Sequence, residues 1–147
     1  MARSRAQSQS KSKRRNEDTR DKNVASERKL NISFSFEHFR GVDSKGVGQT
    51  WDQWHSEGLI VPLLMKLQHL SSITPDIANS EKTLSRYGQF PAESFFTCPE
   101  ELKGKNWGSI RKLGSGGKVR VAGFYGEHNV FYIVFLDKDH QFWPTEN

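Results

Sequence analysis

Residues 117–144 have the sequence GKVRVAGFYGEHNVFYIVFLDKDHQFWP, in which two apolar segments are separated by a short polar turn. Residues 118–125 begin with alternating polar and apolar side chains, the period of a β-strand that has one face in solvent. Residues 130–136 are β-branched or aromatic almost throughout, which predicts an interior strand covered on both faces. Because Gly-Glu-His-Asn at 126–129 is typical of a turn, the two segments predict an antiparallel hairpin.

The residues around this hairpin extend it into a larger sheet. Residues 107–113 predict a further strand, and Gly-Ser-Gly-Gly at 114–117 predicts the turn that joins it to the hairpin. Near the other end of the chain, residues 31–36 place Ile, Phe and Phe at alternate positions, as in a half-buried strand. Residues 41–48, rich in glycine, are expected to form a loop.

The middle of the chain is predicted to be helical. Residues 50–57 begin with a threonine and a glutamine spaced as a capping box, in which each side chain bonds to the backbone N–H of the other residue. Residues 59–70 repeat leucine at helical spacing, which predicts a longer helix with one apolar face. Thr-Pro at 74–75 is typical of a third helix start, and we expect that helix to end by Gly88.

These elements predict the α+β class, with an N-terminal strand, two to three helices and an antiparallel C-terminal sheet in one domain over residues 31–147. That part of the chain contains all seventeen Phe, Trp and Tyr residues, and its twelve basic and thirteen acidic residues nearly cancel. Residues 1–30 contain ten Lys and Arg residues, four Asp and Glu residues and no aromatic residue. A segment with so little to bury predicts a disordered basic tail.

The basic tail has two interpretations. It could be a nucleic-acid arm that gains affinity by releasing counterions from phosphate, or a solubilising terminus without a specific role. The candidate nucleic-acid residues of the tail are Lys11, Lys13, Arg14 and Arg15.

Composition also limits the compartment and the class of protein. No apolar run approaches the roughly 20 residues of a membrane-spanning helix, and the N-terminus lacks the apolar region of a secretory signal. Cys98 is the single cysteine, which excludes an internal disulfide and favours a reducing compartment. We interpret Cys98 as a small buried apolar residue. The chain is therefore expected to be cytoplasmic, without contact to a membrane.

The predicted hairpin places several cations and one histidine near each other. Lys118 and Arg120 would lie on the solvent face of the sheet, with Arg111 or Lys112 on the next strand and His140 just beyond the interior strand. Cations that stabilise a pentacovalent phosphate and a histidine that donates a proton are sufficient for RNA cleavage without a metal. The alternative is an ordinary solvated face with a histidine in a turn.

Motifs of other enzyme classes are missing from the sequence. Residues 114–117 lack the Lys-Ser/Thr that completes a phosphate-binding loop, and no GxSxG or HExxH motif occurs. Asp137, Asp139 and His140 could in principle ligate a divalent ion, but such a cluster within four residues is more typical of a solvated turn. We therefore expect no metal and no cofactor.

The order of the predicted elements, and the closing segment 117–144 in particular, resembles the RelE/ParE superfamily of bacterial toxins. The shared pattern is a basic strand with a central arginine, a short turn, an apolar strand, and then a histidine followed by an aromatic residue. The resemblance implies a small RelE-like fold, with helices on one face of a sheet whose other face docks mRNA in the ribosomal A site. It also implies a toxin whose partners are RNA or the ribosome, and possibly an antitoxin protein.

Transferred to this chain, the resemblance implies roles for individual residues. Arg111, Lys118 and Arg120 would bind or stabilise phosphate, and His140 would act as acid or base; Tyr125 or Tyr132 could assist by stacking or by proton donation. ParE-like members inhibit DNA gyrase instead, so a gyrase-directed inhibitor is an alternative. A second alternative is a binding module without catalysis, which would hold nucleic acid through its basic tail.

Overall fold

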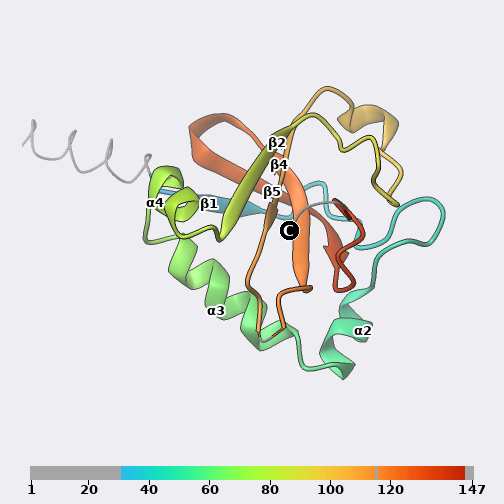
Figure 1. The fold of residues 1–147 in the computed structure, drawn as a ribbon, viewed down its shortest axis with the longest axis horizontal. Helices are drawn as coiled ribbons and strands as arrows, with labels where there is room; N and C mark the ends of the chain where they lie inside the picture. The colour runs from blue at the N-terminus through green and yellow to red at the C-terminus, as the bar shows by residue number, and fades with distance from the viewer. Residues whose placement is uncertain (1–30, 115, 145–147) are drawn as a thin grey trace, which may run out of the picture. The chain divides into compact units, whose positions relative to one another are not determined.

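In the computed structural model, which describes residues 31–114 and 116–144, one sheet has the strand order β1-β5-β4-β3-β2 (Figure 1). The strands are β1 (Ser33–Ser35), β2 (Leu84–Gly88), β3 (Asn106–Ile110), β4 (Arg120–Tyr125) and β5 (Val130–Asp137). The α-helices in these residues are α2 (Trp51–Ser56), α3 (Ile60–Leu70) and α4 (Pro75–Ser80), and single 3₁₀ turns occur at Glu100–Leu102 and Glu127–Asn129. The prediction of the α+β class is confirmed.

The sheet is mixed, because its edge strand β1 runs parallel to β5. Strands β2 to β5 pair antiparallel in sequence, as predicted for the C-terminal part of the chain. Ser33 of β1 pairs with Val130 of β5 and Ser35 with Tyr132, both in parallel register. Nearly a hundred residues separate the two strands in sequence, so no hairpin forces them antiparallel. β5 lies between β1 and β4, which confirms the prediction of an interior strand.

Strand β2 is the main difference from the sequence prediction. The helix expected to continue to Gly88 ends at Ser80, and Lys82 adopts a left-handed backbone conformation. The chain then enters β2, where Leu84 pairs with Ile110 of β3. β3 offers a free row of backbone hydrogen-bonding groups on this side, and pairing with residues 84–88 satisfies them, which overrides a weak local preference for helix.

The helix starts follow the predicted local chemistry. The Thr50 hydroxyl accepts a hydrogen bond from the Gln53 N–H at 3.2 Å, and the Gln53 side chain accepts one from the Thr50 N–H at 2.7 Å. Thr74 caps α4 in the same way, with Pro75 at the first helical position. The capping box of α2 is therefore confirmed, and so is the restart of a helix at Thr74.

Replacing Thr50 with alanine should lower the free energy of unfolding by about 1 kcal/mol, the usual value of an N-cap. The hydroxyl bond to the Gln53 N–H is lost, but the backbone of Thr50 can still bond to the Gln53 side chain. Urea unfolding of wild type, Thr50→Ala and Thr50→Ser measures the effect. Serine should restore most of the stability, and equal losses for both variants would contradict a capping role.

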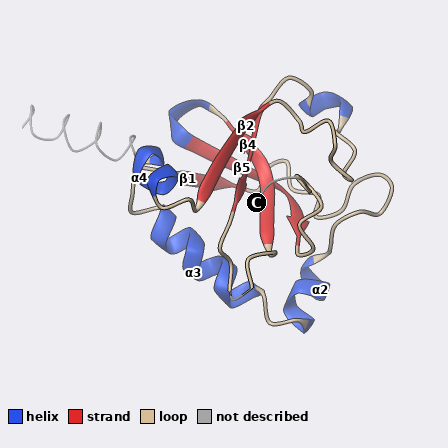
Figure 2. Ribbon diagram, viewed as in Figure 1, coloured by secondary structure: helices blue, strands red, loops and turns tan. Residues whose placement is uncertain are grey.

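Each face of the sheet packs against a separate apolar core. On the first, which we call the helical face, the three helices contribute Trp54, Leu63, Leu70 and Ala78, packed against Leu84, Ile110, Val121, Phe131, Ile133 and Leu136 of the sheet (Figure 2). On the second, which we call the loop face, residues 96–102 and the C-terminal segment contribute Phe96, Leu102 and Phe142, packed against Trp107, Ala122, Phe124, Val134 and Phe135. The sheet is therefore covered on both sides.

This second cover corrects the predicted position of Arg120. The sequence pattern put Arg120 on an open solvent face, but only 5% of the residue is exposed. Every residue of β4 from Arg120 to Phe124 is buried, and only Tyr125 at the end of the strand is partly accessible. The alternation of side chains was read correctly, since Val121 and Ala122 belong to opposite cores.

Two further predictions concern the membrane and the tail. Among the residues that the structure describes, no helix has both the length and the apolar character to cross a membrane. The predicted tail, 1–30, with Lys11, Lys13, Arg14 and Arg15, lies outside the described residues.

Candidate functional site: a polar rung on the loop face

Two arginines and one aspartate lie side by side at one end of the sheet. Ile110 of β3 pairs with Val121 of β4, so Arg111 and Arg120 occupy the next rung of these antiparallel strands. Arg120 itself pairs with Asp137 of β5. Because side chains alternate along a strand, all three belong to the loop face. Arg111, Arg120 and Asp137 thus form one polar rung across three neighbouring strands.

Asp137 is the buried centre of this rung, with none of its surface exposed. Its carboxylate accepts hydrogen bonds from the N–H groups of Gln141 at 2.7 Å and Phe142 at 2.8 Å. Burial raises the pKa of Asp137 to about 6, although these two bonds and the positive charge of Arg120 lower it. At neutral pH the carboxylate is therefore ionised and offsets part of the arginine charge.

His140 lies in the turn that this carboxylate closes. It is three residues beyond the end of β5, as predicted, and adjacent to Gln141, whose N–H donates to Asp137. The residue is half-buried, its Nε2 atom is inaccessible to solvent, and its backbone has a φ of 60°. The turn therefore brings His140 to the end of the sheet that holds Arg120.

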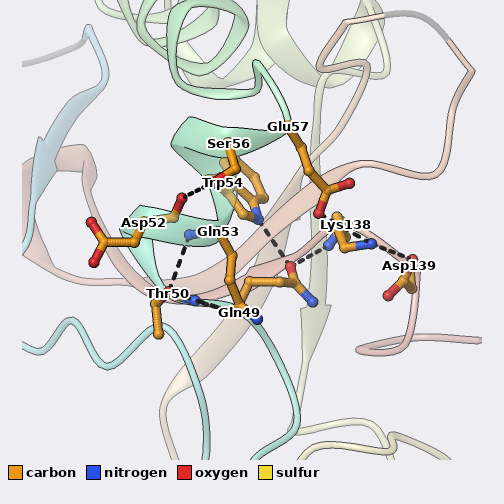
Figure 3. Close-up of polar contacts among 9 residues, drawn as sticks. All are labelled: Gln49, Thr50, Asp52, Gln53, Trp54, Ser56, Glu57, Lys138 and Asp139. Atoms are coloured by element: carbon orange, nitrogen blue, oxygen red, sulfur yellow. Dashed lines mark hydrogen bonds and ion pairs between the residues drawn. The ribbon is translucent and has the colours of Figure 1, made fainter.

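A second set of polar contacts holds the beginning of the same turn (Figure 3). The side-chain oxygen of Gln49 accepts hydrogen bonds from the Trp54 indole at 2.9 Å and from the Lys138 N–H at 2.8 Å. The Lys138 ammonium lies 3.4 Å from the Glu57 carboxylate and 3.5 Å from that of Asp139. Helix α2 is thereby tied to the residues that precede His140.

Strand β2 adds three polar residues that the sequence prediction missed. The Arg111 guanidinium donates to the Ser85 hydroxyl at 3.3 Å, and the Tyr87 hydroxyl lies 2.6 Å from that of Ser109. The ring of Tyr87 packs against that of Trp143, with centroids 4.2 Å apart. These residues escaped notice because residues 74–88 were predicted to be one helix; the polar and apolar alternation of Leu84-Ser-Arg-Tyr was the available signal.

The structure separates two of the predicted cations from the rung. The Lys112 ammonium turns toward the helices and donates to the Glu81 carbonyl at 2.8 Å. Lys118 is exposed, two residues before the start of β4, and does not lie on a strand. Of the four cations proposed from the sequence, Arg111 and Arg120 are the two that share the rung.

Both predicted tyrosines also lie elsewhere. Tyr125 packs with the core of the helical face, beneath the Arg86 guanidinium at 4.4 Å, and burial raises the pKa of its hydroxyl to about 12. Tyr132 is on the loop face, but five residues along β5 from Asp137, or roughly 17 Å. Its ring stacks on Phe124, with centroids 4.8 Å apart. Neither tyrosine is positioned to share a substrate atom with His140.

Cys98 and possible metal ligands complete the set of sequence-predicted features. Cys98 is partly rather than fully buried, and burial raises the pKa of its thiol. Within residues 31–114 and 116–144, no three His, Cys, Asp or Glu side chains are grouped so that they could hold a metal ion.

No family model, no curated protein and no solved structure matches this chain. The function is therefore argued from the rung itself. Its two guanidinium groups can bind and neutralise a phosphate, and the adjacent imidazole can transfer a proton near neutral pH.

Proposed function

We propose that this chain is a RelE-like toxin-type ribonuclease that cleaves RNA, with mRNA as the expected substrate, without a metal ion. The observation that carries the proposal is the meeting of Arg111, Arg120 and His140 at one end of the loop face. These residues come from three separate segments of the chain, and local structure alone would not bring them together. The site would operate in the cytoplasm, on free or ribosome-bound RNA.

The chemistry needs only groups that this site supplies, together with water. The 2′-oxygen of a ribose attacks the adjacent phosphorus, its proton passes to water, and the bond from phosphorus to the 5′-oxygen breaks. Arg111 would bind the phosphate and stabilise its additional negative charge, while the buried Arg120 adds positive potential from behind. His140 would donate the proton that the departing 5′-oxygen requires.

The surroundings of the rung support this assignment. Tyr87 offers an aromatic ring next to Ser109, on the strand adjacent to Arg111. Lys118, exposed before β4, can add a phosphate contact outside the rung. The order of one strand, three helices and four antiparallel strands agrees with the element order on which the family resemblance rests.

Induced expression in a bacterial host, with growth and new RNA 5′ ends followed together, tests the proposal. Wild type should arrest growth and produce new ends, and Arg111→Gln and His140→Gln should each cleave RNA roughly 100-fold more slowly or worse. Lys66→Gln, on the opposite side of the sheet in α3, is the matched control and should behave as wild type. Circular dichroism of each purified variant verifies that it is folded.

The other outcomes separate the alternatives. A folded His140→Gln variant that cleaves as fast as wild type removes His140 from the reaction, and the same holds for Arg111. If wild type stops growth with intact RNA and broken DNA, gyrase is the target. If it neither stops growth nor cleaves RNA, the ribonuclease proposal is wrong, and a binding module that uses residues 1–29 becomes the better hypothesis.

A further inference from the structure

A cavity of about 540 Å³ opens on the loop face at the end of the sheet opposite the polar rung. Its walls are residues 88–90, which follow β2, residues 103–105, which precede β3, and the side chain of Cys98. This volume lies within the range of sites that bind small organic ligands. The cavity belongs to neither the rung nor its supporting contacts.

One wall of the cavity is aromatic and rigid. The Phe90 ring is half-buried and makes edge-to-face contacts with Trp107 at 4.9 Å and Phe142 at 5.0 Å between centroids. Both partners are buried members of the loop-face core. Phe90 therefore presents a fixed apolar surface, suited to a flat ring in the cavity.

The opposite wall carries positive charge. The Lys103 ammonium lies 2.8 Å from the Glu100 carboxylate, so its charge is partly neutralised. The Lys105 ammonium lies 5.4 Å from the centroid of Phe124, and no carboxylate among the described residues lies within ion-pair distance of it. Lys105 is thus the cation available for an anionic ligand.

Strand β3 connects this cavity with the polar rung. Lys105 directly precedes Asn106, the first residue of β3, and Arg111 directly follows Ile110, the last. Five residues of strand span roughly 17 Å, which is the length of about five stacked nucleotides at 3.4 Å each. Between the two sites, the stacked rings of Tyr87 and Trp143 lie half-buried on the same face.

We propose that this cavity binds one nucleotide of a single-stranded RNA, a few positions along the strand from the phosphate that is cleaved. The base would stack on Phe90, and Lys105 would contact the phosphate. This inference rests on the proposed ribonuclease function. It explains how the rung would act on single-stranded RNA, since a second contact about five nucleotides away fixes the path of the strand.

Cys98 provides a direct readout, because it is the only cysteine of the chain and lies in the cavity wall. The probe is a single-stranded octanucleotide with 2′-O-methyl riboses, which lacks the attacking hydroxyl and stays intact. Alkylation of Cys98 in the full chain is followed by mass spectrometry. At an octanucleotide concentration about ten times the Kd, the alkylation rate should fall roughly tenfold.

A lysine substitution tests the phosphate contact by fluorescence anisotropy of the same octanucleotide. Lys105→Gln should weaken binding and lower the slope of log affinity against log salt by about 1, as expected for one lost phosphate contact. Lys66→Gln removes the same charge from the opposite side of the sheet and should leave affinity and slope unchanged.

The outcomes distinguish this inference from the function on which it rests. If the octanucleotide binds but neither protects Cys98 nor responds to Lys105→Gln, the cavity is not a nucleotide site, while the ribonuclease proposal stands on its own test. If the octanucleotide protects Cys98 but unmodified RNA is never cleaved, the cavity is supported and the ribonuclease proposal fails. If RNA is neither bound nor cleaved, both are wrong.

Discussion

Gly123→Ala should destabilise the domain by about 3 kcal/mol or more and should prevent folding near physiological temperature. Gly123 lies at a bulge where the pairing of β4 with β5 shifts by one residue. A Cβ atom at this position would overlap the Tyr132 carbonyl oxygen and would lie 2.9 Å from Cε2 of Phe131. Both obstacles belong to the adjacent interior strand, whose backbone is paired on both sides and cannot withdraw.

Gly46→Ala is the matched control for this substitution. Gly46 has a φ of 85°, but a Cβ atom there would meet no atom within 4 Å. Its replacement should cost about 1 kcal/mol, the conformational penalty alone. Thermal unfolding followed by circular dichroism compares the two variants. Similar losses for both would show that the sheet adapts to the added methyl group.

Asp137→Ala should lower the free energy of unfolding by about 3–5 kcal/mol at neutral pH. The carboxylate accepts two backbone N–H groups and pairs in register with Arg120, and all of these groups are shielded from water. Alanine would leave the two N–H groups and the arginine charge without this acceptor. Urea unfolding measures the loss, and a cost below 1 kcal/mol would contradict this role of Asp137.

The stability that depends on Asp137 should also change with pH. Because its pKa is about 6 in the folded chain and 3.8 in the reference state, the folded chain binds the proton more tightly. The corresponding stabilisation is complete below pH 3.8 and is lost as the pH rises through about 6, with a total of about 3 kcal/mol.

Asp137→Asn isolates this effect, since asparagine has a similar shape and does not titrate. Wild type should lose stability relative to Asp137→Asn between pH 4 and pH 7, whereas other carboxyl groups affect both proteins alike. Parallel pH profiles from urea unfolding would show that the pKa of Asp137 is not raised by folding.

Local sequence determined the parts of this fold that depend on neighbouring residues. The turn at 126–129 joins adjacent apolar segments, so the hairpin of β4 and β5 follows from sequence alone. The capping box of Thr50 and Gln53 and the proline start of α4 are equally local. The candidate site was predictable to the extent that it uses these elements: His140 lies just beyond β5, and Arg120 starts β4.

The remaining features depend on contacts between distant segments, which no local pattern encodes. Residues 84–88 form a strand because β3 needs a partner, and this pairing brings Ser85 and Tyr87 beside Arg111. Arg120 is buried because residues 96–102 and 142–143 cover a face that its own strand would leave open. The sequence by itself determined which residues could form a site. Tertiary packing decided which of them meet, because the choice depends on how apolar surface from the whole chain is buried.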